Sequence, residues 1–350
     1  MKRSLILCVL FICGCGTSSL KQGPPVFAFA FSEYPSWSVF GVASEKGLVN
    51  AAQGKLGTVE KKYNIDIVLK EADYDTCITM YGSNVCDAVC MTNMDAINPC
   101  LNRKTVMILP TSTSDKADAC VVVNYDGKSN PLDYLKNRKV FGLKNSVSEY
   151  VFACNIEKLG GNPKDYQFAN LDPAAAATAL QTNQPSVEAI MVWNPFVLQT
   201  LRTRKDSKVI FDSGNLKEEV IDCVGVSSES LKKPGGDRFA QAICDCYYQM
   251  NKMLADPKVG DETLVALGTK FSNLNLEDMK IVVDQTKFYK TPDSAIRLFS
   301  GSNMKSTMNK VVKFCVDNAI APTAPTVGVN VPWDSSEQLI FTTDFIKKVE

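Results

Sequence analysis

Histidine is absent from all 350 residues of the chain. Its absence excludes Ser-His-Asp catalysis and hydrolysis at metal sites that histidine ligates. An excess of charge of either sign is also lacking, because 38 Lys and Arg residues balance 38 Asp and Glu residues. Nucleic-acid-binding proteins carry a basic face, so this balance argues against a nucleic-acid partner. We expect a protein without catalytic residues, metal ions or cofactors, although a mechanism based on cysteine or carboxylate stays open.

Long apolar runs are missing except at the N-terminus. There, Lys2 and Arg3 precede the apolar run Ser4–Ile12, which is too short to cross a bilayer. This pattern is typical of an export signal. The run ends in I-C-G-C (residues 12–15), which resembles a bacterial lipobox. We therefore expect cleavage before Cys15 and lipidation of this cysteine, and an ordinary secretory signal is the alternative.

The expected export signal places the mature chain in the cell envelope, lipid-anchored to a bacterial membrane on its periplasmic or extracytoplasmic face. We assign residues 1–14 to the signal peptide and residues 15–25 to a tether. Of the 13 cysteines, ten remain after Cys8, Cys13 and Cys15 are set aside. Disulfides form in exported proteins, but sequence alone does not fix their pairing. The spacings also lack the paired C-x2-C of structural zinc sites, so the sequence predicts no metal centre.

Length and composition favour two globular domains. The chain exceeds the usual size of one domain, and its 45% hydrophobic and 22% charged residues suffice for real cores. Short apolar strands alternate with helical segments, which is typical of an α/β fold. We expect two α/β lobes, one formed by residues 26–120 together with 216–350, and the other by residues 121–215.

Two strands end in a polar turn of the same kind, about one hundred residues apart. The segment V-C-D-A-V-C-M-T-N-M-D-A (85–96) is mostly apolar up to Met91 and breaks at Asn93, and V-E-A-I-M-V-W-N-P (187–195) breaks at Asn194. Open α/β sheets bind ligands at the carboxyl ends of their strands. We therefore expect each lobe to offer a strand end to one crevice between the lobes.

Apolar periodicity predicts the other elements. The expected strands are Val26–Ser32, Ile65–Lys70, Thr105–Leu109, Ala119–Asn124, Val209–Asp212 and Val220–Val226. The expected helices include one from Glu71 through Met80 and, near the C-terminus, Asp237–Ala255, Asp261–Thr269, Leu276–Thr286 and Ser302–Asn318. Ser146 and Glu149 match the capping box, in which the two side chains bond backbone N–H groups at a helix start.

Several short motifs carry a resemblance to a known family, in order from about Phe31 to Val327. They are G-x-A-x-E-x-G (41–47), M-T-N-M-D-A (91–96), S-V-S (146–148), V-W-N-P (192–195), F-D-S (211–213) and E-V-I-D (219–222). The ordered set resembles the solute-binding lipoproteins of bacterial ABC importers, in the nitrate, sulfonate and taurine branch. Within that branch it looks most like the urea-carboxylase-region binding proteins.

The resemblance implies the bilobal class II periplasmic-binding-protein fold, with two crossovers between α/β lobes and hinge closure on a ligand. It also implies a monomeric receptor that captures a small nitrogen-rich solute, such as urea or a guanidine, and delivers it to a membrane permease with its ATPase. Binding without turnover is expected, so the chain should not be an enzyme. A pyrimidine-precursor-binding protein, a relative of the thiamine-pyrimidine synthase, a sensor and an adhesin stay open as alternatives.

A planar, polar and cationic ligand needs aromatic faces, in-plane acceptors and exclusion of water. Trp37 and Trp193, one in each lobe, are the candidates for stacking, and Asn93 and Asn194 can bond the edge of the ligand. The full set of candidate substrate-binding residues is Tyr34, Trp37, Asn93, Asp95, Ser148, Glu149, Trp193, Asn194 and Glu219, with Asp73 and Tyr74 in addition. Core packing, helix capping and solvated carboxylates are the alternatives. An anion such as taurine, an alkylsulfonate or nitrate would need Arg or Lys in these turns, and none stands there.

Overall fold

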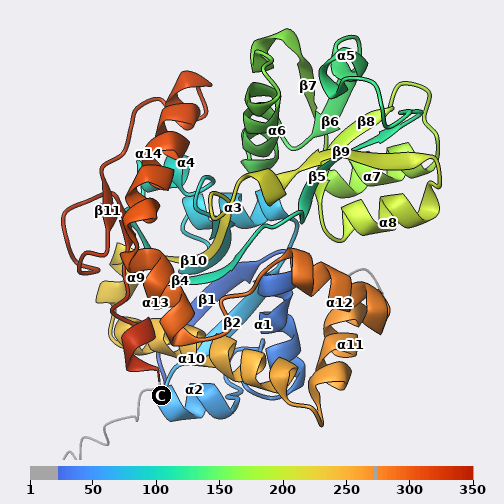
Figure 1. Cartoon of the computed structure of the whole chain (residues 1–350). Coiled ribbons are helices and arrows are strands. Elements are labelled where there is room, and N and C mark those ends of the chain that lie inside the picture. The colour runs from blue at the N-terminus through green and yellow to red at the C-terminus, as the bar shows by residue number, and fades with distance from the viewer. Residues whose placement is uncertain (1–22, 271–273, 350) are drawn as a thin grey trace, which may run out of the picture.

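The computed structural model describes residues 23–270 and 274–349. The expected signal peptide, Cys15 and residues 15–22 of the expected tether lie outside the described residues. The described chain forms two α/β lobes, each built around its own sheet. In Figure 1 the smaller lobe, in green and yellow, stands above the larger lobe, in blue, orange and red.

The larger sheet has seven strands in the order β11-β12-β4-β10-β3-β1-β2. Strand β1 is parallel to β2 and β3, whereas β10 is antiparallel to both of its neighbours, β3 and β4. The strands are Val26–Phe31 (β1), Asp66–Glu71 (β2), Ala88–Thr92 (β3), Thr105–Thr113 (β4), Ile221–Ser227 (β10), Val327–Val329 (β11) and Leu339–Phe341 (β12). Every residue of β3, β4 and β10 is buried, so these central strands are covered on both faces.

The smaller sheet has five strands in the order β7-β6-β8-β5-β9. Strand β6 is parallel to β7 and β8, and β5 is antiparallel to β8 and β9. The strands are Asp118–Val123 (β5), Lys139–Gly142 (β6), Gln167–Asn170 (β7), Ala189–Trp193 (β8) and Ser207–Asp212 (β9). The antiparallel register places Asp118 of β5 opposite Trp193 of β8.

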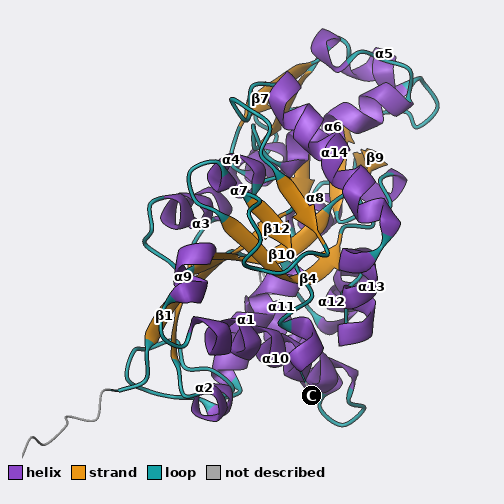
Figure 2. Ribbon diagram, turned by 90° about the vertical axis from the view of Figure 1, so that its left-hand side faces the viewer, coloured by secondary structure: helices purple, strands orange, loops and turns teal. Residues whose placement is uncertain are grey.

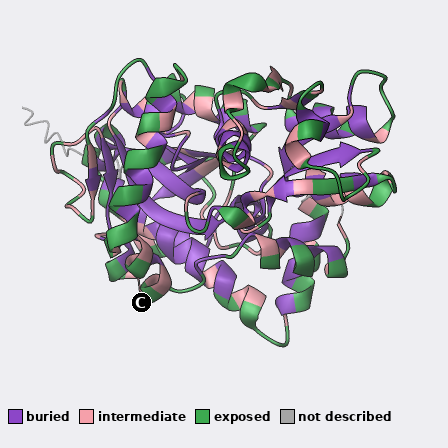
Figure 3. Cartoon of the chain, turned by 45° about the horizontal axis from the view of Figure 1, so that its top comes forward, coloured by how far each residue is buried: buried purple, intermediate pink, exposed green. Residues whose placement is uncertain are grey.

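Helices pack around both sheets, and Figure 2 shows them enclosing the strands of the larger lobe. In the larger lobe they are Pro35–Glu45 (α1), Thr58–Tyr63 (α2), Tyr74–Gly82 (α3), Ile97–Cys100 (α4), Ser228–Lys232 (α9), Gly236–Ala255 (α10), Gly260–Lys270 (α11), Leu276–Gln285 (α12), Pro292–Ser300 (α13) and Ser302–Asp317 (α14). In the smaller lobe they are Pro131–Leu135 (α5), Val147–Lys158 (α6), Pro173–Gln181 (α7) and Phe196–Thr203 (α8). Exposed residues gather on the outer faces of helices and in loops, while the strands are mostly buried (Figure 3).

Two crossovers join the lobes, one from β4 to β5 and the other from β9 to β10. They meet each other, because the hydroxyls of Ser114 and Ser213 lie 2.7 Å apart and share a hydrogen bond. The side chain of Asn93 holds the second crossover, since its Oδ1 accepts from the N–H of Ile221 (3.0 Å) and its Nδ2 donates to the carbonyl of Glu219 (3.1 Å). These bonds tie the two crossovers to each other and to the end of β3.

Strand β3 begins at Ala88, three residues later than the sequence suggested. Val85 is 51% exposed and belongs to no strand. Asp87 is half-buried, and its carboxylate accepts hydrogen bonds from the N–H of Ala28 (2.8 Å) and from Ser230 Oγ (2.7 Å). The carboxylate of Asp87 therefore links β1 and α9 to the residue that precedes β3.

Helix α3 begins at Tyr74, and the expectation that it begins at Glu71 is wrong. Glu71 is the last residue of β2, where it pairs with Phe31. Asp73 then caps the helix, because its Oδ1 accepts a hydrogen bond from the N–H of Thr76 (2.8 Å). The cap places the Tyr74 side chain at the start of the helix, against the other lobe.

The ten cysteines of the described residues are free thiols. Nine are buried and Cys154 is half-buried, so they pack as small apolar side chains. Within residues 23–270 and 274–349, no cluster of three Cys, Asp or Glu side chains is placed to hold a metal ion. Over the same residues, no helix combines the length and apolarity that crossing a membrane would require.

Candidate ligand site between the lobes

A small cavity, here called the interlobe cavity, lies between the two lobes. Its volume is about 10 Å³, which is room for about one water molecule. The larger lobe contributes Tyr34, Trp37, Tyr74, Thr92, Val220 and Asp222 to its wall, and the smaller lobe contributes Asp118, Val147 and Trp193. The lobes are therefore closed on each other in this structure, and a larger guest requires them to move apart.

Four aromatic rings form a continuous chain along the wall of the interlobe cavity. Tyr34 and Trp37 have ring centroids 4.8 Å apart, and Trp37 stacks on Tyr74 at 5.4 Å with an angle of 18° between the rings. Tyr74 then meets Trp193 of the other lobe edge to face, at 5.8 Å. The first turn of α1, the start of α3 and the end of β8 therefore bring aromatic faces from both lobes to one place.

Two carboxyl groups, those of Asp118 and Asp222, face the interlobe cavity from opposite lobes. Both residues are 1–2% exposed. Ser114 Oγ donates to Asp118 Oδ2 at 2.5 Å, and Ser112 Oγ donates to Asp222 Oδ2. Burial raises the pKa of Asp118 to about 7. Burial, and then the charge of Asp118, raise the pKa of Asp222 well above its ordinary value.

A third carboxyl group, that of Asp95, stands behind the aromatic chain. Asp95 is half-buried, and its Oδ2 accepts hydrogen bonds from the Tyr74 hydroxyl (2.6 Å) and from Thr92 Oγ1 (2.7 Å). Burial raises its pKa to about 6, although these two hydrogen bonds and the backbone N–H of Val147 oppose the shift. Asp95 thus orients Tyr74, and its charge adds to the negative potential around Asp118 and Asp222.

Two polar atoms of the cavity wall have no hydrogen-bond partner among the described residues: the hydroxyl of Tyr34 and Nε1 of Trp37. Tyr34 and Trp37 are only 4% and 3% exposed. The hydroxyl of Tyr34 lies near the carboxyl of Asp222 and the hydroxyl of Ser114, and neither contact has the geometry of a normal hydrogen bond. Burial raises the pKa of Tyr34 well above its ordinary value, and the charges of Asp222 and Asp118 raise it further. Buried polar groups are nearly always hydrogen-bonded, so these two point to a guest that supplies partners.

The charge of the interlobe cavity is one-sided. Among the described residues, no Lys or Arg lines it, whereas Asp118 and Asp222 do. Carboxylates accept hydrogen bonds and attract cations. Aromatic faces also attract cations. If the lobes move apart, the residues of this wall can therefore bind a small group that is rich in N–H donors.

The candidate residues from the sequence occupy four kinds of place. Tyr34, Trp37 and Trp193 line the interlobe cavity together. Ser148 and Asn194 are fully buried but do not line it, and Ser148 Oγ and Asn194 Oδ1 have no hydrogen-bond partner within the described part of the chain. Asn194 Nδ2 donates to Gln285 Oε1 (2.7 Å), a contact between the lobes. Asn93 and Asp95 hold the crossover and the aromatic chain, as described above.

The carboxylates of Glu149 and Glu219 lie away from the interlobe cavity. Glu149 Oε2 accepts from the N–H of Asn145 (2.8 Å), and Ser146 Oγ accepts from the N–H of Ser148 (3.2 Å). Ser146 therefore caps the helix as expected, but the other half of the expected capping box is wrong. Glu149 accepts from the N–H of Asn145, the residue before Ser146, and not from that of Ser146. Glu219 instead contacts α6 and α14 on the outer side of the lobe interface.

Sequence reasoning missed Asp118 and Asp222 as site residues. Asp222 belongs to the motif E-V-I-D, and Asp118 precedes the apolar run of β5, so the signal was a single carboxylate next to a buried strand. Tyr74 was considered only as an additional candidate, although it contacts rings of both lobes. A charged residue at the border of a buried strand is therefore the sign to look for.

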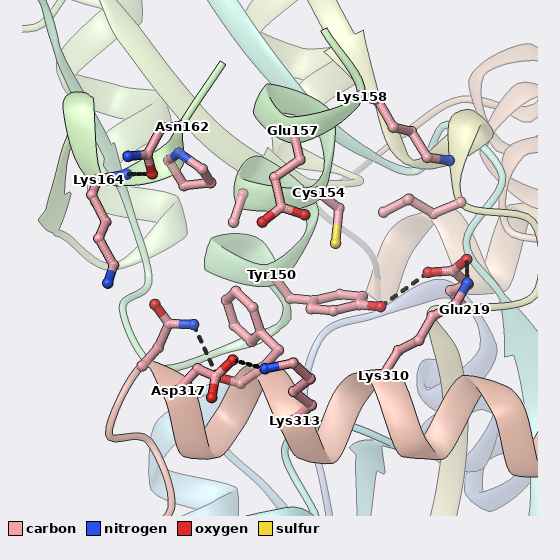
Figure 4. Close-up of a pocket in the computed structure, with 15 residues that line it drawn as sticks. Tyr150, Cys154, Glu157, Lys158, Asn162, Lys164, Glu219, Lys310, Lys313 and Asp317 are labelled. Atoms are coloured by element: carbon pink, nitrogen blue, oxygen red, sulfur yellow. Dashed lines mark hydrogen bonds and ion pairs between the residues drawn. The ribbon is translucent and has the colours of Figure 1, made fainter. Parts of the chain in front are cut away.

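A much larger cavity, here called the outer groove, opens between α6 and α14 (Figure 4). Its volume is about 720 Å³. The Tyr150 hydroxyl donates to Glu219 Oε2 (3.0 Å), Lys310 Nζ pairs with Glu219 Oε1 (2.9 Å), and the rings of Tyr150 and Phe314 meet edge to face at 5.0 Å. The basic residues of its wall are Lys158, Lys164, Lys310 and Lys313. The outer groove is therefore wide, open to solvent and rich in lysine.

No family model matches the chain, and no curated protein matches it. Solved structures do. The aliphatic sulphonate-binding protein SsuA of Escherichia coli is 16% identical, with a TM-score of 0.67, and the match covers 86% of this chain and 90% of that one. The nitrate-binding protein NrtA of Synechocystis is 11% identical, with a TM-score of 0.58 and coverage of 94% and 100%.

A third match is a Candida albicans protein that is described as having the generic periplasmic binding protein fold. It is 16% identical to this chain, with a TM-score of 0.59 and coverage of 82% and 90%. Identities this low carry the fold and not the ligand. The expected α/β architecture is confirmed: the chain has the bilobal periplasmic-binding-protein fold.

Proposed function

We propose that this protein is the substrate-binding component of an ABC importer, and that it captures a small nitrogen-containing solute of the urea or guanidine type between its lobes. The observation that carries the proposal is the interlobe cavity, where rings and carboxyls from both lobes meet around two unpartnered polar atoms, those of Tyr34 and Trp37. Lobes that share one site close on their ligand by hinge motion. The closed form would then be recognised by a membrane permease with its ATPase.

The proposed roles of the candidate residues follow from their positions. Trp37 and Trp193 stack on the solute, and Tyr34 bonds it. Asn93 positions the second crossover, and Asp95 positions the aromatic chain. Ser148 and Asn194 lie behind the cavity wall, where their hydrogen bonds change when the lobes open. Glu149 and Glu219 act outside the cavity, on the helix cap and on the lobe interface.

Four of the solved structures that share this fold are named for anions, three for sulphonates and one for nitrate. This likeness favours an anionic solute as the second candidate. An anion would have to lie beside Asp118 and Asp222 without a Lys or Arg among the described residues of the wall. A buried anion needs a paired cation or several hydrogen-bond donors, and the unpartnered donors of this wall are Trp37 Nε1 and the Tyr34 hydroxyl. Because two carboxyl groups and no Lys or Arg of the described residues share the wall with them, we favour the nitrogen-containing solute.

The anchoring of the protein belongs to the same proposal. Lipidation of Cys15 would hold the receptor at the outer face of a bacterial membrane, next to its permease. The replacement Cys15→Ser should shift the protein from the membrane fraction to the soluble fraction of the envelope. The mass of the membrane-bound form should exceed that of the bare chain by an acylated glycerol. An unmodified mass would contradict the anchor and leave the binding function untouched.

Native mass spectrometry of the protein, purified without denaturation from the cells that make it, tests the function. The expected result is a bound small solute that is released on mild activation, and whose addition to the dialysed protein raises the unfolding temperature. A second check is small-angle scattering, in which the solute should make the dialysed protein more compact. A protein that carries no solute and responds to none in a panel of urea, guanidinium, amidinium, taurine and nitrate would contradict the proposal.

A further inference from the structure

We propose that the solute in the interlobe cavity is a small planar cation of the guanidinium or amidinium class, and that Asp118 and Asp222, one from each lobe, select it by charge. This inference rests on the proposed binding function of the cavity. It goes further, because it assigns a charge to the solute and names two residues that the sequence did not single out.

The positions of the two acids suit a clamp that forms on closure. Asp118 is the first residue of β5 and follows the first crossover, whereas Asp222 lies in β10 directly after the second. Ser114 and Ser213, whose hydroxyls join the crossovers, both contact Asp118: its N–H lies 3.2 Å from Ser114 Oγ and 3.3 Å from Ser213 Oγ. The two carboxyls therefore meet at the interlobe cavity, beside the crossovers that join the lobes.

The free hydrogen-bonding capacity of these groups fits a donor-rich planar cation. Ser114 Oγ donates to Oδ2 of Asp118 and Ser112 Oγ donates to Oδ2 of Asp222, and the second oxygen of each carboxylate, Oδ1, is an acceptor of the kind that the solute needs. The unpartnered hydroxyl of Tyr34 can accept a further N–H. A guanidinium or amidinium group presents N–H donors in one plane and a face that the rings of Trp37 and Trp193 can cover.

The charge around the cavity favours a cation independently of these bonds. A narrow acidic groove, here called the entrance groove, shares Tyr74 and Trp193 with the interlobe cavity and has a volume of about 310 Å³. Its acidic residues are Glu33, Glu71, Asp73, Asp75 and Asp172, and no Lys or Arg from the described residues lines it. One-signed grooves concentrate ions of the opposite sign, so this path draws cations toward the aromatic wall.

Proton exchange should accompany the binding of such a cation. The groups that face Asp118 and Asp222 are the carboxyl of Asp95, the hydroxyls of Ser112 and Ser114, the phenols of Tyr34, Tyr247 and Tyr289, and the thiols of Cys90 and Cys223. Burial raises the pKa of each of these phenols and thiols, so they stay protonated below pH 9. A cation therefore replaces carboxyl protons, and its affinity should rise with pH.

Calorimetric titration of the dialysed protein with guanidinium chloride, acetamidinium chloride, urea, taurine and nitrate, at constant ionic strength and pH 8, tests the proposal. We expect one of the two cations to bind at least about 30-fold more tightly than urea, and the anions not to bind. Below pH 7 the cation affinity should fall by about tenfold per pH unit for each proton displaced. Titrations in two buffers of different ionisation enthalpy should show proton release.

Asp118→Asn and Asp222→Asn should each weaken cation binding by at least about tenfold, because a charged hydrogen-bond acceptor is lost. Asp317→Asn on the outer groove is the matched control and should leave the affinity unchanged. Both cavity variants should unfold no earlier than the unaltered protein, since each replaces a carboxyl group whose ionisation is disfavoured by burial with a neutral amide. This measurement separates lost binding from lost folding.

The outcomes distinguish failure of the proposed cation selectivity from failure of the proposed receptor function. Binding of urea, taurine or nitrate in the absence of cation binding would overturn the choice of a cation and leave the receptor function standing. Full affinity for the cation in both Asp→Asn variants would overturn the assignment of the two residues. Failure of every cation to bind would overturn the inference as a whole.

Discussion

The interlobe cavity and the outer groove lie between the same two lobes and differ in almost every physical respect. The interlobe cavity holds about 10 Å³ of space, whereas the outer groove holds about 720 Å³. The smaller one is walled by aromatic rings and two buried carboxyls, and the larger one by four lysines and the carboxylates of Glu157, Glu219 and Asp317. In Figure 4 the side chains of Lys310 and Lys313 extend from α14 and pair with Glu219 and Asp317.

This difference shows that size alone does not mark a binding site. In the outer groove the charged groups satisfy one another, since Lys310 pairs with Glu219 and Lys313 pairs with Asp317. In the interlobe cavity the groups are buried and two polar atoms remain without a partner among the described residues. A buried polar atom without a hydrogen-bond partner destabilises the protein, and a ligand that supplies the partner recovers that free energy. A solvent-exposed ion pair is already satisfied, so a ligand gains little by contacting it.

The first prediction removes the ring that the smaller lobe brings to the interlobe cavity. Trp193→Ala should weaken binding of the guanidinium or amidinium ligand by about 30-fold or more, because a desolvated cation–π contact is worth about 2 kcal/mol. Isothermal calorimetry at pH 8 measures it. Lys313→Met in the outer groove is the control and should keep full affinity. Equal losses in the two variants would abolish the distinction between the two spaces.

The second prediction concerns the unpartnered Nε1 of Trp37. Trp37→Phe keeps an aromatic face and removes the N–H. Guanylurea carries a carbonyl oxygen next to its cationic group, so its affinity should fall by about tenfold in this variant, which is the cost of one lost hydrogen bond. The affinity for guanidinium, which has no acceptor atom, should change less than twofold. A parallel loss for both ligands would mean that Trp37 acts through its ring alone.

The third prediction uses pH and the missing histidines. The pKa of Asp118 is about 7 and that of Asp95 about 6 in the folded chain, against roughly 4 when unfolded. Between pH 4 and 7 the folded state therefore binds more protons, and stability without ligand falls as pH rises through this window. No histidine titrates there. Asp118→Asn should flatten the decline of the unfolding temperature from pH 5 to 8 and raise it by a few degrees at pH 8. A decline unchanged in the variant would contradict the assignment.

The sequence predicted the two lobes better than the ligand site. Strands follow from local patterns, whereas the site depends on contacts between residues that are far apart in the sequence. Apolar runs bounded by polar turns reveal strands locally, so β8 and its terminal Trp193 could be expected as a strand end with an aromatic ring. Asp118 looked like any carboxylate beside a strand. Its burial arises because the antiparallel register sets it against Trp193, which lies 75 positions later in the chain.

Glu219 shows the opposite error. A carboxylate in a matching motif suggested a ligand contact, but its partners come from distant helices, Tyr150 from α6 and Lys310 from α14. No local pattern in the sequence reveals that these two helices face each other across the lobe interface. The sequence can thus name residues next to a crevice, whereas the packing of the lobes decides which of them face a ligand.

The smallest expected effect belongs to the contact that Glu219 makes across the lobe interface. Glu219 links Tyr150 of the smaller lobe to Lys310 of the larger one, so it stabilises the closed arrangement without contacting the interlobe cavity. Glu219→Gln keeps the hydrogen-bond acceptor for Tyr150 and removes the ion pair, which is exposed on the lysine side and worth about 0.5 kcal/mol. Ligand affinity should therefore fall only about twofold, and raising the salt concentration should erase the difference from the unaltered protein. A loss as large as that of Trp193→Ala would show that the ligand site extends into the outer groove.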